Sequence, residues 1–94
     1  MIVEVLYFAE IKEITGKEQE KFELSEPYLE NLIKILIKNY GKKLKNILWD
    51  EVNQEISDLI SILINNETVY EKNPTFVNLN HGDTIVFLMP VSGG

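Results

Sequence analysis

The chain of 94 residues contains no cysteine and no arginine. Without cysteine, disulfides, thiolate metal sites and a cysteine nucleophile are excluded. Without arginine, the chain lacks the side chain best suited to bidentate binding of phosphates. Its nine lysines are outnumbered by fifteen acidic residues, which gives a formal net charge of −6. We therefore expect no nucleic-acid partner, because that kind of binding depends on neutralising phosphates with basic side chains.

Long apolar runs are also lacking. The longest, such as 59–64 and 85–91, are interrupted by polar residues or are far too short to span a bilayer, so we expect no membrane segment. Met1 leads into an alternating pattern with an acid at Glu4 rather than into the basic start of a signal peptide. A composition of 45% hydrophobic and 26% charged residues is typical of one globular domain, expected here over residues 1–94 in the cytoplasm.

The first half of the chain predicts two strands and two helices. Residues 2–8 are rich in β-branched and aromatic side chains, 9–15 have helical spacing and stop at Gly16, and 18–24 alternate like a strand with one solvated face. The strongest periodic signal is the apolar stripe of a long helix over 29–40, which ends at Gly41. The candidate N-cap of this helix is Ser25, with Pro27 in its first turn.

The second half predicts mainly strands. Residues 44–58 favour a second, shorter helix. An extended segment over 59–64 is followed by Asn65 and Asn66, which tolerate positive φ and therefore predict a hairpin. Residues 74–79 are typical of a loop or short edge strand, and 80–83 of a turn before a buried strand over 84–88.

The order of these elements predicts the fold class. A long helix that crosses between early and late strands favours parallel pairing of the first and last strands. The expected fold is α+β: a ubiquitin-like β-grasp, in which one long helix covers a mixed sheet.

Both ends of the chain carry a family resemblance. The segments Val5-Leu6-Tyr7-Phe8-Ala9 and 80–94, the latter ending in Pro90-Val91-Ser92-Gly93-Gly94, are similar to the small, sulfur-carrying subunit of molybdopterin synthase and its relatives. Asn65 also matches an asparagine that family members usually carry before the final loop. Two departures are visible: Met89 stands where a proline is common, and Lys12 where an arginine is common.

The resemblance implies that Gly94 is the site of adenylation and thiocarboxylation, with Gly93 as its slender neighbour. A carboxylate is a poor electrophile, but an acyl-adenylate made with ATP has a leaving group that a sulfur nucleophile can displace. Glycine at both positions lets the backbone pass through a narrow channel in a partner. Residues 90–94 are expected to form a flexible tail, which spans about 17 Å when extended.

The resemblance also implies partners. These are the large subunit of molybdopterin synthase, a ubiquitin-activating-like adenylyltransferase that consumes the ATP, and a sulfur donor protein. Sulfur would pass to a pyranopterin precursor to form the dithiolene of the molybdenum cofactor. The chain itself would bind no cofactor or metal, and it is expected to be a subunit without catalytic activity of its own, since it lacks a nucleophile, base and metal constellation.

Alternation along the last strand separates two sets of side chains. We expect Phe87, Met89 and Val91 on one face, and Val86, Leu88 and Pro90 on the other. We assign partner docking to Phe87, Met89 and Val91, because a partner must hold the carrier beside its reactive end. The alternative is that the rest of the protein covers both faces of this strand.

Two other functions share the same activation step. One is a sulfur carrier for another product, such as the thiazole of thiamine or a thiolated tRNA base. The other is a ubiquitin-like protein modifier, whose Gly94 would form an isopeptide bond with lysine. The residues do not separate these alternatives, nor molybdenum from tungsten.

Overall fold

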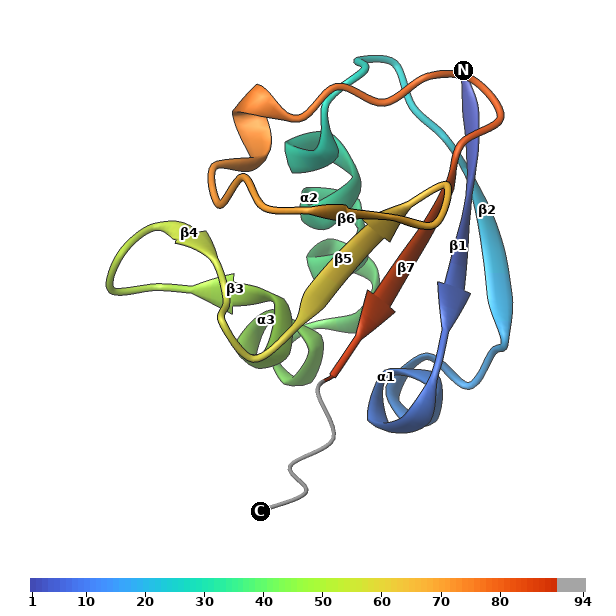
Figure 1. Ribbon diagram of the computed structural model, residues 1–94. Helices are drawn as coiled ribbons and strands as arrows, with labels where there is room; N and C mark the ends of the chain where they lie inside the picture. The colour runs from blue at the N-terminus through green and yellow to red at the C-terminus, as the bar shows by residue number, and fades with distance from the viewer. Residues whose placement is uncertain (90–94) are drawn as a thin grey trace.

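The first and last strands of the described chain lie side by side in one mixed sheet. The computed structural model describes residues 1–89, and residues 90–94 lie outside the described part. The strands of this sheet are β1 (Ile2–Tyr7), β2 (Gln19–Glu23), β5 (Ser61–Ile64), β6 (Glu67–Val69) and β7 (Thr84–Leu88). Their order is β2-β1-β7-β5-β6, and β1 pairs in parallel with β7 (Figure 1). The predicted parallel pairing is confirmed.

The register places apolar side chains on the covered face of the sheet. In β1, Val3, Val5 and Tyr7 are at most 2% exposed, as expected for a strand that alternates with period two. Tyr7 lies opposite Phe87, and both belong to the core. The predicted hairpin between β5 and β6 is also confirmed, with Asn65 and Asn66 at φ 52° and 69° in its turn.

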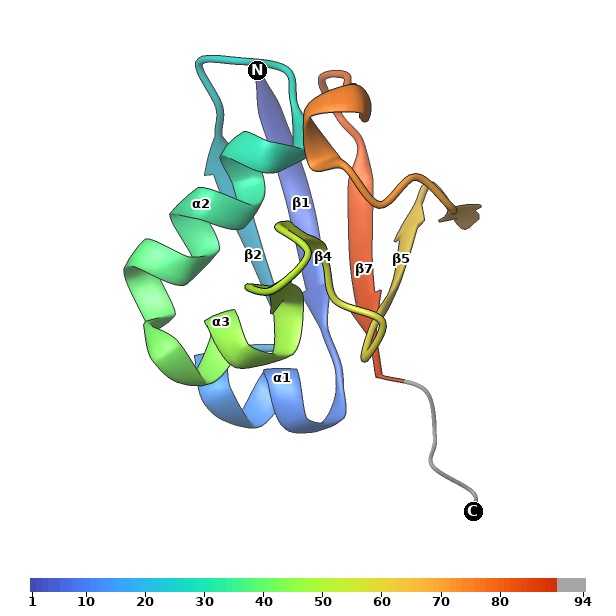
Figure 2. The same cartoon turned by 90° about the vertical axis from the view of Figure 1, so that its left-hand side faces the viewer.

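Helices cover one face of the sheet and leave the other face open. Figure 2 shows them on one side of the strands. The helices are α1 (Ala9–Thr15), α2 (Leu29–Tyr40), α3 (Lys42–Leu48) and the 3₁₀ turn η1 (Pro74–Phe76). In α2 the predicted stripe faces the core, where Leu29, Leu32 and Leu36 are fully buried. The first and last strands of the chain are parallel neighbours in a mixed sheet, and helices cover one face of that sheet. This arrangement is a β-grasp fold.

The expected N-cap of the long helix is wrong. The N-cap position is Tyr28 rather than Ser25, and no side chain caps it. Instead the Leu29 N–H donates to the backbone carbonyl of Val77 at 2.9 Å. The first N–H groups of a helix have no partner within the helix. Here one of them bonds to the backbone of a distant segment rather than to the side chain of Ser25.

The expected helix over 44–58 is also only partly correct. The helix α3 ends at Leu48 and a small hairpin follows, made of β3 (Trp49–Asp50) and β4 (Glu55–Ile56). The Asp50 carboxylate accepts hydrogen bonds from the Val52 and Asn53 N–H groups, at 3.0 and 3.1 Å. These bonds compete with helical hydrogen bonding, so the chain turns back instead of continuing the helix.

Candidate functional site

The reactive end expected from the sequence lies beyond the described residues. Gly93, Gly94 and Val91 all fall in 90–94, so the structure gives the base of this tail rather than its course. That base is Met89, which directly follows β7. Because β7 pairs with β1 on one side and with β5 on the other, the point from which the tail departs is fixed by two neighbouring strands.

Apolar side chains gather on the open face of the sheet towards the tail. Glu4 lies opposite Thr84 at the far end, whereas Leu6 lies opposite Val86 nearer the tail. Phe8 follows the last paired residue of β1 and is 47% exposed, and Leu59, two residues before β5, is 56% exposed. We call the exposed or partly exposed members of this set the tail-base patch: Leu6, Phe8, Leu59, Leu63 and Leu88. Val86 lies on the same face but is only 8% exposed, so it supports the patch from below.

The structure corrects the expected placement of Phe87. Phe87 is 1% exposed, because it points to the covered face, where its ladder neighbours Tyr7 and Ile62 are buried as well. It therefore offers no surface to a partner. Met89 is partly buried and packs against the core, and Val91 lies outside the described residues.

The sequence prediction missed the exposed members of the tail-base patch. Phe8 is about 80 positions before the tail in the chain, and Leu59 is about 30 positions before it. Only strand pairing brings β1, which precedes Phe8, and β5, which follows Leu59, to the two sides of β7. Leu88 had been placed on the face opposite Phe87, and that alternation was the available signal. The choice between the two faces required knowledge of which side the helices cover.

The turn before β7 is held by side chains rather than prepared for catalysis. The Asn65 amide donates to Asp83 at 2.8 Å, and its oxygen accepts from the Thr84 N–H at 3.0 Å. Asp83 in turn accepts from the Asn80 N–H at 2.8 Å. His81 Nδ1 accepts from the Ile2 N–H at 3.0 Å, so the predicted turn role of His81 is confirmed. These contacts fix β7 against β5 at the end away from the tail.

A second polar cluster joins β1, β2 and α2. The Glu20 carboxylate accepts hydrogen bonds from the hydroxyls of Tyr40 at 2.6 Å and Tyr7 at 2.8 Å, and pairs with Lys17 at 2.9 Å. Burial raises the pKa of Glu20, but these hydrogen bonds outweigh burial and hold the pKa below its ordinary value. Burial, followed by the bond to Glu20, raises the pKa of Tyr7 well above its ordinary value. The cluster keeps a carboxylate charged at the junction of three elements.

Neither a cluster suited to a metal ion nor a membrane-spanning helix is found among residues 1–89. Within this part of the chain, histidine and acidic side chains do not gather in threes where they could hold a metal ion. None of its helices has the length and apolar character needed to cross a bilayer.

Comparison with known proteins adds a family and several related folds. The model of a family described as the ThiS family matches residues 5–94, which is nearly the whole chain. No curated protein matches the chain.

Three solved structures illustrate the likeness. The crystal structure of small archaeal modifier protein 1 from Haloferax volcanii is 21% identical, with full coverage of both chains and a TM-score of 0.80, which shows the fold. Small archaeal modifier protein 1 from Methanosarcina acetivorans is 28% identical, with 99% and 96% of the two chains covered and a TM-score of 0.78. A chain in the complex of subunits 1 and 2 of the molybdopterin-converting factor from Helicobacter pylori is 28% identical, with full coverage of both chains and a TM-score of 0.65.

Proposed function

Because this chain belongs to the ThiS family, we propose that it carries sulfur as a thiocarboxylate on Gly94 and acts as the small subunit of molybdopterin synthase. At the coarser level, the chain is a β-grasp sulfur carrier or small modifier of the ThiS type. Of these two roles the proposal selects the sulfur carrier, and the product that it names is the dithiolene of the molybdenum cofactor. The observation that carries it is the match of the family model through the terminal Gly93-Gly94 of a β-grasp domain.

The proposed chemistry proceeds in two partner-catalysed steps. The Gly94 carboxylate attacks the α-phosphate of ATP, pyrophosphate leaves, and an acyl-adenylate forms. The terminal sulfur of a persulfide on a donor protein then attacks the acyl carbon and displaces AMP, which gives an acyl disulfide. A thiol attacks the donor sulfur of this disulfide, so that the thiocarboxylate leaves and the thiol and the donor sulfur end joined in a disulfide. The carrier's own contribution is positional: β7, held between β1 and β5, presents residues 90–94 to each partner in turn.

The tail-base patch supports this assignment. A carrier must be held beside its reactive end by the activating enzyme and later by the sulfur acceptor. Exposed apolar side chains such as Phe8 and Leu59 are suited to such an interface. The Helicobacter pylori relative comes from a complex of subunits 1 and 2 of the molybdopterin-converting factor, which supports a large-subunit partner here. We therefore propose the tail-base patch, in place of Phe87, as the docking surface.

The second candidate function is protein modification. It is favoured by the likeness to small archaeal modifier protein 1 from Methanosarcina acetivorans, which is as high in identity as the likeness to the Helicobacter pylori subunit. The same adenylate would then be attacked by a lysine amine, and Gly94 would end in an isopeptide bond. A carrier of sulfur to thiamine or to tRNA would share the thiocarboxylate and differ in its acceptor.

Deletion of Gly94 tests the reactive position. We expect the free energy of unfolding to change by less than about 0.5 kcal/mol, because a terminal glycine has no side chain to contribute to the core. Sulfur transfer should be abolished in a reconstituted assay that contains the activating enzyme, sulfur donor, large subunit and pterin precursor. If the truncated chain still supported dithiolene synthesis, Gly94 would not be the carrier position.

Intact-mass measurement separates carrier from modifier. Protein recovered from its native cells should be heavier than the encoded chain by the replacement of one oxygen with sulfur, and should co-purify with a larger pterin-binding subunit. A modifier would instead leave a diglycine remnant on substrate lysines after digestion. Abundant conjugates of that kind, without thiocarboxylate or pterin-binding partner, would establish the modifier function.

A further inference from the structure

The charges of this acidic protein are strongly segregated. Five of the nine lysines fall within residues 34–45, and residues 34–49 contain no acid, so this segment has a formal charge of +5. The remainder of the chain carries −11. The segment forms the second half of α2, all of α3 and the start of β3. The helical side of the molecule therefore carries a basic segment, although the net charge of the chain is −6.

A groove lies within this basic region. It is bounded by α2, α3, the β3–β4 hairpin and η1, and its volume is about 560 Å³. Its apolar lining consists of Ile33, Ile37, Trp49 and Pro74. Trp49 is partly buried and packs against the core, so it forms a firm wall rather than a mobile side chain.

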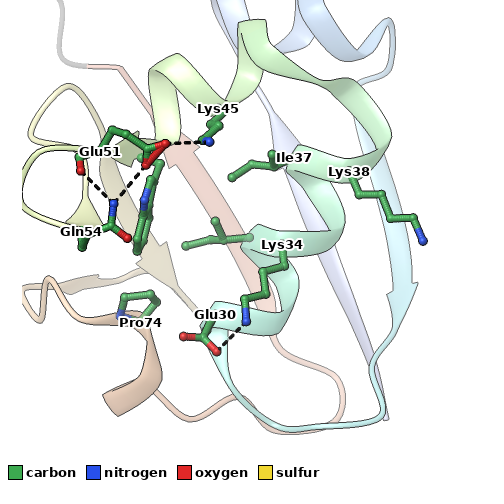
Figure 3. Close-up of a pocket in the computed structure, with 10 residues that line it drawn as sticks. Glu30, Lys34, Ile37, Lys38, Lys45, Glu51, Gln54 and Pro74 are labelled. Carbon is green, nitrogen blue, oxygen red and sulfur yellow. Dashed lines mark hydrogen bonds and ion pairs between the residues drawn. The ribbon is translucent and has the colours of Figure 1, made fainter.

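Two ion pairs hold charged side chains at the rim. Lys34 pairs with Glu30 at 3.2 Å, and Lys45 pairs with Glu51 at 2.8 Å. Gln54 donates to the Glu51 carboxylate at 3.1 Å, which ties the hairpin turn to the pair (Figure 3). Because Glu30 and Glu51 line the groove together with the lysines, the groove is not uniformly positive. It is therefore poorly suited to the phosphate backbone of a nucleic acid.

Three lysines of the basic segment have no such partner, and one of them, Lys38, lines the groove. Lys38, Lys42 and Lys43 are exposed, and none has a carboxylate oxygen within 4.0 Å among residues 1–89. In Figure 3 the Lys38 side chain extends away from α2, outward from the groove. Their ammonium groups are available to carboxylates that approach from outside, at a cost in desolvation that is small for exposed side chains.

The groove and the tail-base patch lie on different sides of the sheet. The groove is lined by residues of α2 and α3, and Figure 2 shows these helices on one side of the strands. The outward side chains of β1, β5 and β7 that form the patch point to the other side. A protein bound at the groove would leave the open sheet face free for the enzyme that handles the tail.

We propose that this groove is a second docking site, which binds an acidic segment of a partner polypeptide that carries an apolar anchor. The anchor packs between Ile37 and Trp49, and a flanking carboxylate pairs with Lys38, the lysine of the groove that has no acidic partner among residues 1–89. Charge complementarity identifies the occupant, because the basic segment selects an acidic chain and the apolar lining selects one with a hydrophobic side chain. The proposal stands apart from the function of Gly94, since it invokes no residue of the tail or of the tail-base patch.

The single tryptophan gives a direct readout. Because Trp49 is the only tryptophan in the chain, intrinsic fluorescence of the full-length protein reports on the groove. The probe is a blocked synthetic peptide of about a dozen residues in which glutamates flank two adjacent leucines. We expect a saturable change in Trp49 emission that weakens as salt is raised from about 0.05 M to about 0.5 M, since exposed ion pairs are screened.

Matched changes on both partners test specificity. Lys38→Glu should weaken binding about three- to tenfold, the range expected when an exposed ion pair is turned into a repulsion. Lys21→Glu, an equal change in net charge at an exposed position of β2, should leave binding unchanged. Peptides with serines in place of the leucines, or lysines in place of the glutamates, should bind at least about tenfold more weakly.

Several results would overturn the proposal. The first is no saturable change in Trp49 emission, and the second is equal loss in Lys38→Glu and Lys21→Glu. Tighter binding of a single-stranded oligonucleotide than of the peptide would assign the face to nucleic acid instead. A shift of Trp49 emission with protein concentration alone, accompanied by dimerisation, would assign it to a second copy of the chain.

Discussion

Glu20 is the residue at which electrostatics most clearly affects the stability of the fold. It receives hydrogen bonds from Tyr7 of β1 and Tyr40 of α2, and the two tyrosine rings meet edge to face with centroids 6.4 Å apart. The carboxylate itself belongs to β2. A charge that is stabilised in this way in the folded state has a lowered pKa, so protonation of Glu20 is linked to unfolding.

The pH dependence of stability tests this linkage. The pKa of Glu20 is lower in the folded chain than its ordinary value of 4.5, so its stabilisation is fully present above that value and is lost as pH falls through the folded-state pKa. Chemical denaturation between about pH 6 and about pH 3 should therefore show a smaller loss of stability in Glu20→Gln than in the unmodified chain. Glu23→Gln, in an exposed position of the same strand, is the control and should retain the original slope. Parallel slopes for all three proteins would contradict the assignment.

At the scale of elements, α2 joins the sheet to the other helices. Its buried stripe includes Leu32 and Leu36, both with no exposed surface, and its last residue reaches the Glu20 cluster through Tyr40. Because α2 packs against the strands that present the tail, loosening α2 is expected to affect the whole domain rather than the site alone.

Truncation of Leu36 measures this packing. Leu36→Ala should lower the free energy of unfolding by about 2–5 kcal/mol, the range for a leucine removed from a filled core. Leu59→Ala removes the same atoms at a position that is 56% exposed, and should change stability by no more than about 0.5 kcal/mol. Both values can be obtained from denaturant titrations. A small loss at Leu36 would mean that α2 turns a different face to the sheet.

Elements whose patterns are local could be predicted from the sequence, and those that depend on distant partners could not. The alternation of β1, the stripe of α2 and the Asn65-Asn66 turn are each visible within a few residues, and all were confirmed. The hairpin after α3 was missed because each of its strands has only two residues, too few to show alternation. The N-cap of α2 was predicted wrongly because the first N–H of the helix donates to the carbonyl of Val77, almost 50 positions away.

The candidate site divides in the same way. Gly93 and Gly94 were identified from a family resemblance in the sequence, and the structure describes the strand that leads to them. The tail-base patch could not be found from the sequence, because Phe8 and Leu59 come next to the end of β7 only through strand pairing. Phe87 was assigned to the wrong face for lack of that same information.

At the scale of the whole molecule, the two proposed docking surfaces lie on different sides of the sheet. The open sheet face is apolar near the tail, and the helical side carries the basic segment around an apolar groove. A carrier that passes between an activating enzyme and an acceptor must release one partner before the other can occupy the same tail. Two separate docking surfaces would let the order of binding be controlled without moving the reactive end.

A charge placed in the tail-base patch tests whether partners grip the domain or only its tail. Phe8→Lys should raise the KM for the carrier in adenylation by the activating enzyme at least about fivefold, because a buried cation in an apolar interface is left without a partner. Its unfolding free energy should change by no more than about 1 kcal/mol, since the Phe8 side chain is 47% exposed. Val52→Lys is the matched control, because Val52 is 90% exposed on the β3–β4 hairpin, away from the end of β7 (Figure 1). Equal KM values for the two variants would show that the activating enzyme recognises residues 90–94 alone, and the open face of the sheet would then have no part in docking.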